Sequence, residues 1–396
     1  MFRNKTSYSD IGKILFIFIC LLYGWVPFEA GSYDASFKIH LIFMLLLMIY
    51  AFYSNSFKLS KYGMLFFIFF IFLSSILFFV SYGRAIYSFI PAIAFASIVV
   101  PAIYNNTQFK YQFTQALFVL IVISIIMVFF QVIVYFTTGD LLLLHEFVFP
   151  FSKARIATEL QFNNLTRMGG MYIEPGTYSN YMFLLLTLYF FLKKEINNRI
   201  IFFTALSIIL TYSLWGMIFS LYLLLLLFVI NFLRGSLKRK IFLLLIVIIG
   251  TFYGIQKIEN SSAFQFSVAK LERNGSQNST GAKKIAYEKF SKNFDNLFFI
   301  GDGFAPNFRS EISSLQDAGL LLNLAIVFGI IPTVILFIFF IFFIFKLTNY
   351  TIVLISLPIF MSKIFYWDPA FWLLVTMVYY EYNNRYKKIE INGETK

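Results

Sequence analysis

Residues 115–136 read QALFVLIVISIIMVFFQVIVYF, a run without a single charged side chain. A helix of this length extends about 33 Å, enough to cross the hydrocarbon core of a bilayer, which is roughly 30 Å thick. Residues 62–80 form a second stretch of comparable length and character. Hydrophobic residues make up 60% of the chain and charged residues 13%, and the mean hydropathy is +0.78. A soluble domain cannot hide so much apolar surface, so the sequence predicts an all-α integral membrane protein.

Further apolar runs continue this pattern along the whole chain, which we expect to form one polytopic membrane domain, residues 1–396, of about 12 transmembrane helices. The predicted spans are residues 11–28, 38–54, 62–82, 85–104, 115–137, 177–192, 200–212, 214–233, 240–256, 318–346, 348–363 and 367–382. Residues 211–213 (Thr-Tyr-Ser) interrupt the run from 200 to 233, and one helix of that length would overshoot a bilayer. This stretch therefore predicts two helices.

The cations of the short connections predict the orientation of the spans. A cytoplasmic N-terminus places most of these Lys and Arg residues on the cytoplasmic side, as the positive-inside rule requires. They are Lys58, Lys61, Lys110, Lys193, Lys194, Arg199, Arg234, Lys238, Arg239, Lys240, Lys346, Arg385, Lys387 and Lys388. With an even number of spans, both termini are cytoplasmic. Two large extracytoplasmic loops then result, residues 138–176 and 257–317, and we expect the chemistry there.

Several function classes are disfavoured by what the sequence contains. The single cysteine permits no disulfide within the chain and no CxxC metal site. A Gly-rich phosphate loop followed by Lys-Ser/Thr is missing, which argues against ATP-driven work. The outer-loop carboxylates, among them Glu159, Glu174, Asp302 and Asp317, are scattered and form no Asp-x-Asp pair. We therefore expect no metal and no cofactor, and no nucleic-acid partner.

The most informative stretch is residues 166–176, TRMGGMYIEPG. Pro175 suits the first turn of the helix that follows, and a carboxylate at Glu174 suits a helix N-terminus, so one interpretation is a helix cap. The other is chemical, with Glu174 as a general base and Arg167 as a phosphate clamp at the bilayer surface. The sequence leaves both open. His145 lies in a short amphipathic stretch, residues 141–149, and is interpreted as an interfacial polar residue.

The pattern Arg-x-x-Gly-x-x-x-Glu-Pro, at Arg167, Gly170, Glu174 and Pro175, resembles the outer-loop motif of the O-antigen polymerase (Wzy) and O-antigen ligase superfamily. Four later stretches also resemble segments of that family. They are Thr211 to Gly216, with Leu214 where the family often has Arg; Arg273 through Gly281 to Lys284; Phe299 to Phe304; and Asp317 to Leu320, followed by Gly329-Ile330.

This resemblance implies a metal-independent glycosyltransferase in the bacterial cytoplasmic (inner) membrane, with its active site on the outer face. It would transfer a glycan from undecaprenyl pyrophosphate to a sugar hydroxyl of the next lipid-linked repeat unit. Membrane lipids, a chain-length regulator and a flippase are its implied partners. The candidate catalytic residues are Glu174, Arg167, Arg273 and Asp317. The candidate substrate-binding residues are Arg309, Lys283, Lys284, Arg155, Arg84 and Tyr172. Guanidinium groups would stabilise the departing diphosphate through bidentate hydrogen bonds, which a lysine cannot supply.

Three other functions remain open at this point. An O-antigen ligase usually has a His just ahead of the helix that here begins near Gly319, where this chain has Ser-Ser-Leu-Gln-Asp at residues 313–317. A flippase or another transporter of lipid-linked oligosaccharides often shows paired repeats and charges within its spans, and these spans are nearly free of charge. A scaffold without chemistry would not need arginines and carboxylates gathered at one membrane face.

Overall fold

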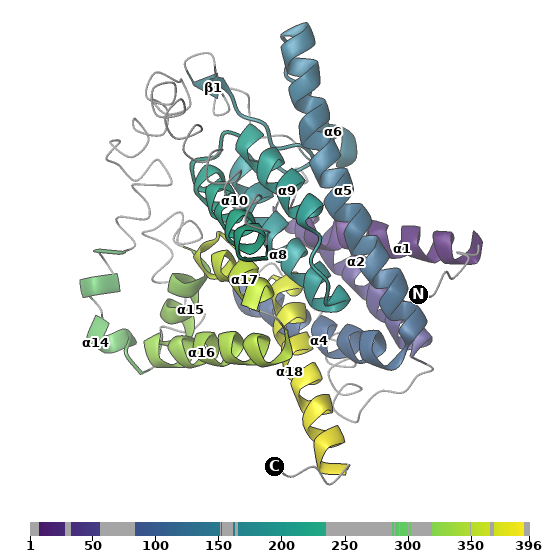
Figure 1. Cartoon of the computed structure of the whole chain (residues 1–396), viewed down its shortest axis with the longest axis vertical. Coiled ribbons are helices and arrows are strands. Elements are labelled where there is room, and N and C mark those ends of the chain that lie inside the picture. The colour runs from purple at the N-terminus through teal and green to yellow at the C-terminus, as the bar shows by residue number, and fades with distance from the viewer. Residues whose placement is uncertain are drawn as a thin grey trace.

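The computed structural model describes residues 8–27, 33–55, 84–150, 152, 161–162, 165–234, 287–288, 290–292, 294–299, 301, 319–348, 350–364 and 368–391. Its helices are α1 (Tyr8–Trp25), α2 (Tyr33–Ser54), α4 (Arg84–Asn105), α5 (Thr107–Thr138), α6 (Leu144–Val148), α8 (Pro175–Lys193), α9 (Asn198–Leu210), α10 (Leu214–Arg234), α14 (Phe294–Leu297), α15 (Leu320–Phe328), α16 (Ile330–Leu347), α17 (Tyr350–Met361) and α18 (Pro369–Ile391). Two-residue strands β1 (Gln161–Phe162) and β2 (Leu165–Thr166) pair antiparallel. The fold is otherwise helical (Figure 1).

Four helices of the described part of the chain are long and apolar enough to cross a membrane: α1, α5, α10 (from Trp215 to Phe232) and α16. On α5, large apolar side chains such as Ile126, Ile133 and Phe136 are exposed. Exposed apolar surface of this kind suits helices that face lipid. The predicted spans at residues 62–82 and 240–256 lie outside the described residues.

The longest described helix, α5, has 32 residues, about 48 Å, and is therefore longer than the core of a bilayer is thick. Its start is fixed by Asn106, whose side-chain oxygen accepts hydrogen bonds from the backbone N–H groups of Gln108 and Phe109 at 2.9 and 3.0 Å. Its end is fixed by Gly139, which has a left-handed backbone (φ 80°) and whose N–H donates a hydrogen bond to the carbonyl of Tyr135. The upper end of α5 projects beyond the other helices (Figure 1).

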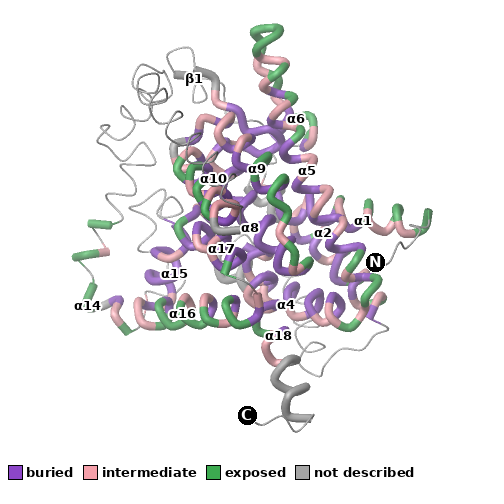
Figure 2. Tube along the Cα trace, viewed as in Figure 1, coloured by how far each residue is buried: buried purple, intermediate pink, exposed green. Residues whose placement is uncertain are grey.

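At the centre of the bundle lies α8, which packs against α5, α9, α10, α17 and α18. Every residue of α8 from Tyr178 to Leu192 is buried, and Figure 2 shows the buried part of the chain concentrated around it. At its C-terminal end, Lys194 Nζ lies 2.7 Å from Glu381 Oε2 of α18, which also accepts a hydrogen bond from Tyr104 of α4 at 2.9 Å. Packing along its length and the ion pair at its C-terminal end therefore hold α8 in place.

Two predictions about helix boundaries can be compared directly with the structure. The division of residues 200–233 is confirmed, because α9 ends at Leu210 and α10 begins at Leu214. The single span predicted over residues 318–346 is wrong. It is broken into α15 and α16 at Gly329, whose backbone (φ 102°, ψ 161°) is essentially restricted to glycine. In Figure 1 the two helices run in clearly different directions.

Candidate functional site

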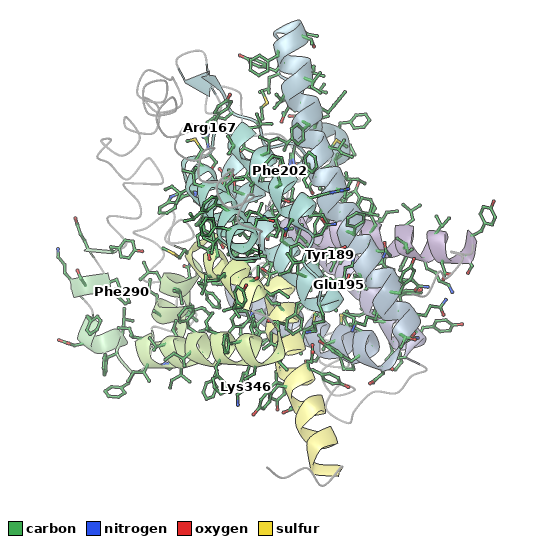
Figure 3. All side chains as sticks on the ribbon, in the orientation of Figure 1. Arg167, Tyr189, Glu195, Phe202, Phe290 and Lys346 are labelled. Carbon is green, nitrogen blue, oxygen red and sulfur yellow. The ribbon has the colours of Figure 1, made fainter. Side chains whose placement is uncertain are left out.

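The segment from Arg167 to Glu174 leads from β2 into the first turn of α8. Its two charged ends are partly exposed, whereas all six residues between them are buried. In Figure 3, Arg167 lies at the upper edge of the helical body and Lys346 at the lower edge. We call residues 167–174 the site loop. It presents one guanidinium and one carboxylate at the end of the bundle where α8 begins.

Glu174 occupies the N-cap position of α8, with extended backbone, and Pro175 follows at the first helical position. Its carboxylate accepts a hydrogen bond from the Thr177 hydroxyl at 3.2 Å, and among the described residues it caps no backbone N–H of the first turn. The prediction that Glu174 suits the N-terminus of a helix is confirmed by its position at the N-cap of α8, although the carboxylate forms no hydrogen-bonded cap. The carboxylate still lies at the positive end of the α8 dipole, which favours its ionised form.

The centre of the site loop is fixed to α5. The N–H of Gly170 donates to the side-chain oxygen of Gln131 at 2.9 Å, and the side-chain N–H of Gln131 donates to the carbonyl of Leu142 at 2.7 Å. Gly170 has a left-handed backbone (φ 59°), and a Cβ atom there would lie 2.9 Å from Val128 Cγ2. Only glycine meets both requirements without strain. Gln131 was not predicted as a site residue.

The next residue of the loop is fixed to α6. His145 Nδ1 lies 2.8 Å from the carbonyl oxygen of Met171, and its Nε2 lies 2.7 Å from Ser152 Oγ. The residue is 3% exposed, so His145 does not present its ring at an exposed surface. It is instead a buried contact between α6 and the site loop. The polar ring, which suggested an interfacial position, instead forms a hydrogen bond with the backbone carbonyl of Met171, 26 residues later in the chain.

Tyr172 was predicted to bind substrate, but its side chain is 2% exposed and lies beneath the loop. Its ring packs against those of Tyr178 and Tyr181 in α8, with centroid distances of 5.4 and 6.1 Å. Burial raises the pKa of the Tyr172 hydroxyl, which faces Ser124 of α5. The Tyr172 side chain thus packs the site loop against α8, and none of its surface is exposed enough to contact a substrate.

The turn between α9 and α10 lies beside the start of α8. A Cβ atom on Gly176 would lie 3.8 Å from Ser213 Oγ, and one on Gly216 would clash with Ser179 Oγ. Tyr178 and Ser207 share a hydrogen bond of 2.6 Å between α8 and α9. The structure therefore brings together two of the stretches on which the family resemblance rests, residues 167–176 and 211–216.

A second pair of these stretches also meets, around Gly329. The N–H of Ile331 donates to the carbonyl of Phe298 at 3.1 Å, and a Cβ atom on Gly329 would lie 2.8 Å from the carbonyl oxygen of Phe299. The backbone that precedes Gly301 therefore contacts the break between α15 and α16. At the other end of α15, the N–H of Leu320 donates to the carbonyl of Ser362 at 2.9 Å.

The other predicted site residues cannot be placed beside the loop. Arg84 is the first residue of α4, and its side chain lies outside the described part of the structure. The remaining candidates lie entirely outside the described residues: Arg155, Arg273, Lys283, Lys284, Arg309 and Asp317. Within the described residues, no three His, Cys, Asp or Glu side chains gather in a way that could hold a metal ion.

The site loop combines a hydrogen-bond donor suited to phosphate oxygens with a carboxylate able to accept a proton. Both flank a buried segment whose backbone is hydrogen-bonded to α5 and to α6, so rigid elements hold the segment between them. In comparisons with known proteins, no family model and no curated protein matches this chain.

Proposed function

We propose that this protein is a surface-glycan polymerase of the bacterial inner membrane. It transfers a growing glycan from undecaprenyl pyrophosphate to a hydroxyl of the next lipid-linked repeat unit. The observation that carries the proposal is the site loop, in which Arg167 and Glu174 flank six buried residues at the start of the central helix. O-antigen or a related surface polysaccharide is the expected product.

In the proposed reaction, the bond between the anomeric carbon of the donor sugar and the pyrophosphate oxygen breaks. A bond forms from that carbon to the acceptor oxygen. The acceptor hydroxyl gives its proton to Glu174, and the electron pair of the broken bond leaves with the pyrophosphate. Arg167 donates hydrogen bonds to the oxygens on which negative charge grows, and such donors stabilise the transition state more than the ground state. The arginines Arg273 and Arg309 are proposed to contribute further contacts of this kind.

Membrane partitioning supports the location of this chemistry. A polyprenyl tail keeps the donor in the bilayer and places its pyrophosphate at the surface, so the clamp has to lie where a span begins. Glu174 directly precedes α8, whose buried residues are mostly apolar. An outward-facing site would also meet the repeat units after they have been moved across the membrane, so the polymerase would act after a flippase.

The proposal is tested with purified protein in liposomes and a pyrophosphate-linked repeat unit, with products separated by length on a gel. Arg167→Ala should lower turnover by about 10²–10³-fold and Glu174→Gln by about 10²–10⁴-fold. Arg167→Lys should restore little, because an ammonium group lacks the planar fork. Arg199→Ala is the matched control, since Arg199 is an exposed arginine at the start of α9. Wild-type chain length in both site variants would refute the proposal.

Deletion of the gene separates the proposal from its alternatives. A polymerase mutant should display a single repeat unit per acceptor on the cell surface. Accumulation of free lipid-linked polymer would instead indicate a ligase, and loss of outward-facing precursor would indicate a flippase.

A further inference from the structure

Gln131 is a buried amide within the most apolar part of α5. It is 4% exposed, and both ends of its side-chain amide are used. Gly170 supplies an N–H and Leu142 a carbonyl, so only one orientation of the amide satisfies both partners. An amide buried in apolar surroundings is costly unless it is hydrogen-bonded. Gln131 therefore has a fixed direction as well as a fixed place.

His145 is fixed in the same manner. A backbone carbonyl can only accept, so Nδ1 carries the hydrogen in the contact with Met171. In the neutral ring Nε2 is then the acceptor, and the hydroxyl of Ser152 donates to it. The frame that carries the ring is fixed as well. The hydroxyl of Tyr23 in α1 donates to the carbonyl of Val148, and the rings of Tyr23 and Phe149 meet edge to face at 5.3 Å.

These two side chains hold consecutive residues at the midpoint of the site loop. Gly170 lies three residues after Arg167, and Met171 lies three residues before Glu174. The hydrogen bonds therefore constrain both halves of the loop from its centre and contact neither charged side chain. A shift of this midpoint would move the guanidinium and the carboxylate relative to each other.

We infer that Gln131 and His145 are the positioning residues of the candidate site, acting through the backbone of Gly170 and Met171. This inference rests on the proposed function, because it assigns the two residues to the same reaction. Neither residue contacts substrate. They set the separation of Arg167 from Glu174, and a misplacement of about 1 Å can lower a rate by about 10²-fold.

The test compares Gln131→Leu with Gln112→Leu. Gln112 is a glutamine of the same helix, 2% exposed, that also makes two side-chain hydrogen bonds of 3.0 Å, with Asp10 and Tyr50. Its loss should weaken the fold in a similar way without touching the loop. We expect Gln131→Leu to lower kcat by about 10²-fold while the KM for the lipid-linked repeat unit changes little, and Gln112→Leu to retain wild-type kcat. Equal kcat in the two variants would overturn the inference.

A second pair of variants covers the case in which Gln131→Leu does not fold. The side-chain N–H of asparagine occupies about the position of Nδ1 in histidine, so His145→Asn should keep the donor to Met171 and retain most of the turnover. His145→Phe removes the donor and should therefore lose most of the turnover. Equal turnover in these two variants would also overturn the inference.

Hydrogen–deuterium exchange separates failure of this inference from failure of the proposed function. The amide of Gly170 should exchange faster in Gln131→Leu than in the wild type, and at the wild-type rate in Gln112→Leu. If the wild-type protein makes no polymer, the proposed function fails, and this exchange result still decides whether Gln131 holds the loop. Unchanged exchange at Gly170 in Gln131→Leu would show that it does not.

Discussion

Replacement of Gly170 by alanine tests whether the site loop is held against α5 as the structure has it. The left-handed backbone costs an alanine about 1–2 kcal/mol. The new Cβ would also lie 2.9 Å from Val128 Cγ2 and 3.3 Å from the Val128 backbone nitrogen, and overpacking of this kind costs about 1–3 kcal/mol. We therefore expect Gly170→Ala to lower the free energy of unfolding by about 2–5 kcal/mol.

Gly139 provides the matched control. It also has a positive φ, 80°, but a Cβ atom there would meet nothing within 4 Å. Gly139→Ala should therefore show only the backbone cost of about 1–2 kcal/mol. Reversible unfolding in mixed detergent micelles, followed by circular dichroism, measures both losses. If the two variants lose equal stability, Gly170 does not lie against Val128 and the loop is not packed as described.

A double-mutant cycle then assigns the excess to its cause. Val128→Ala removes Cγ2, which is the closest atom, and leaves the backbone nitrogen of residue 128 in place. Gly170→Ala should therefore cost about 1 kcal/mol less in the Val128→Ala background than in the wild type, since contacting residues couple on this scale. Strict additivity of the two losses would indicate that the clash lies elsewhere.

Other perturbations test contacts around α8 and the proposed chemistry. Lys194→Ala should cost about 1–3 kcal/mol by leaving the carboxylate of Glu381 without its 2.7 Å partner, and a third of Lys194 is exposed, which reduces the loss. Adding Glu381→Gln should recover part of this stability, and no recovery in thermal unfolding would contradict the assignment. Gly216→Ala should lower the free energy of unfolding by about 1–3 kcal/mol, because the new Cβ overpacks the contact of α10 with α8. Adding Ser179→Ala should reduce this loss, because the serine oxygen is the atom closest to the new Cβ. Turnover of the purified protein should persist in EDTA, and a loss that divalent ions restore would contradict a metal-free reaction.

The apolar spans were predictable because insertion into lipid imposes a one-dimensional rule on the sequence. A helix must satisfy its own backbone within an apolar run, so α1, α5, α10 and the division between α9 and α10 follow from composition and interruption. The break at Gly329 does not follow from such a rule. Residues 320–345 are apolar apart from a few small or amide side chains, and glycine is common in membrane helices. What makes glycine necessary there is the carbonyl of Phe299, which approaches from a distant part of the chain.

The candidate site was predictable at its ends and not at its centre. Arg167 and Glu174 carry charge next to an apolar run, which is unusual enough to be noticed in a sequence. Gln131 gives a weaker signal. An uncharged polar residue inside this uncharged run of 22 residues must find a partner, but the sequence does not indicate that the partner is a backbone N–H 39 residues later. His145 was interpreted from its local pattern, whereas its role depends on Met171.

The burial of α8 links the fold to the proposed chemistry. A helix packed on nearly every side cannot slide or rotate without disturbing its neighbours, so the backbone of Glu174 at its first turn has a fixed position. Arg167 does not belong to a buried helix. The hydrogen bonds at Gly170 and Met171 instead constrain the position of the backbone that carries Arg167. The relative position of Arg167 and Glu174 is thus set by elements that lie inside the bundle. In the proposed reaction, contacts made elsewhere in the two predicted outer loops would then change which sugars are accepted without changing the distance over which the charges act.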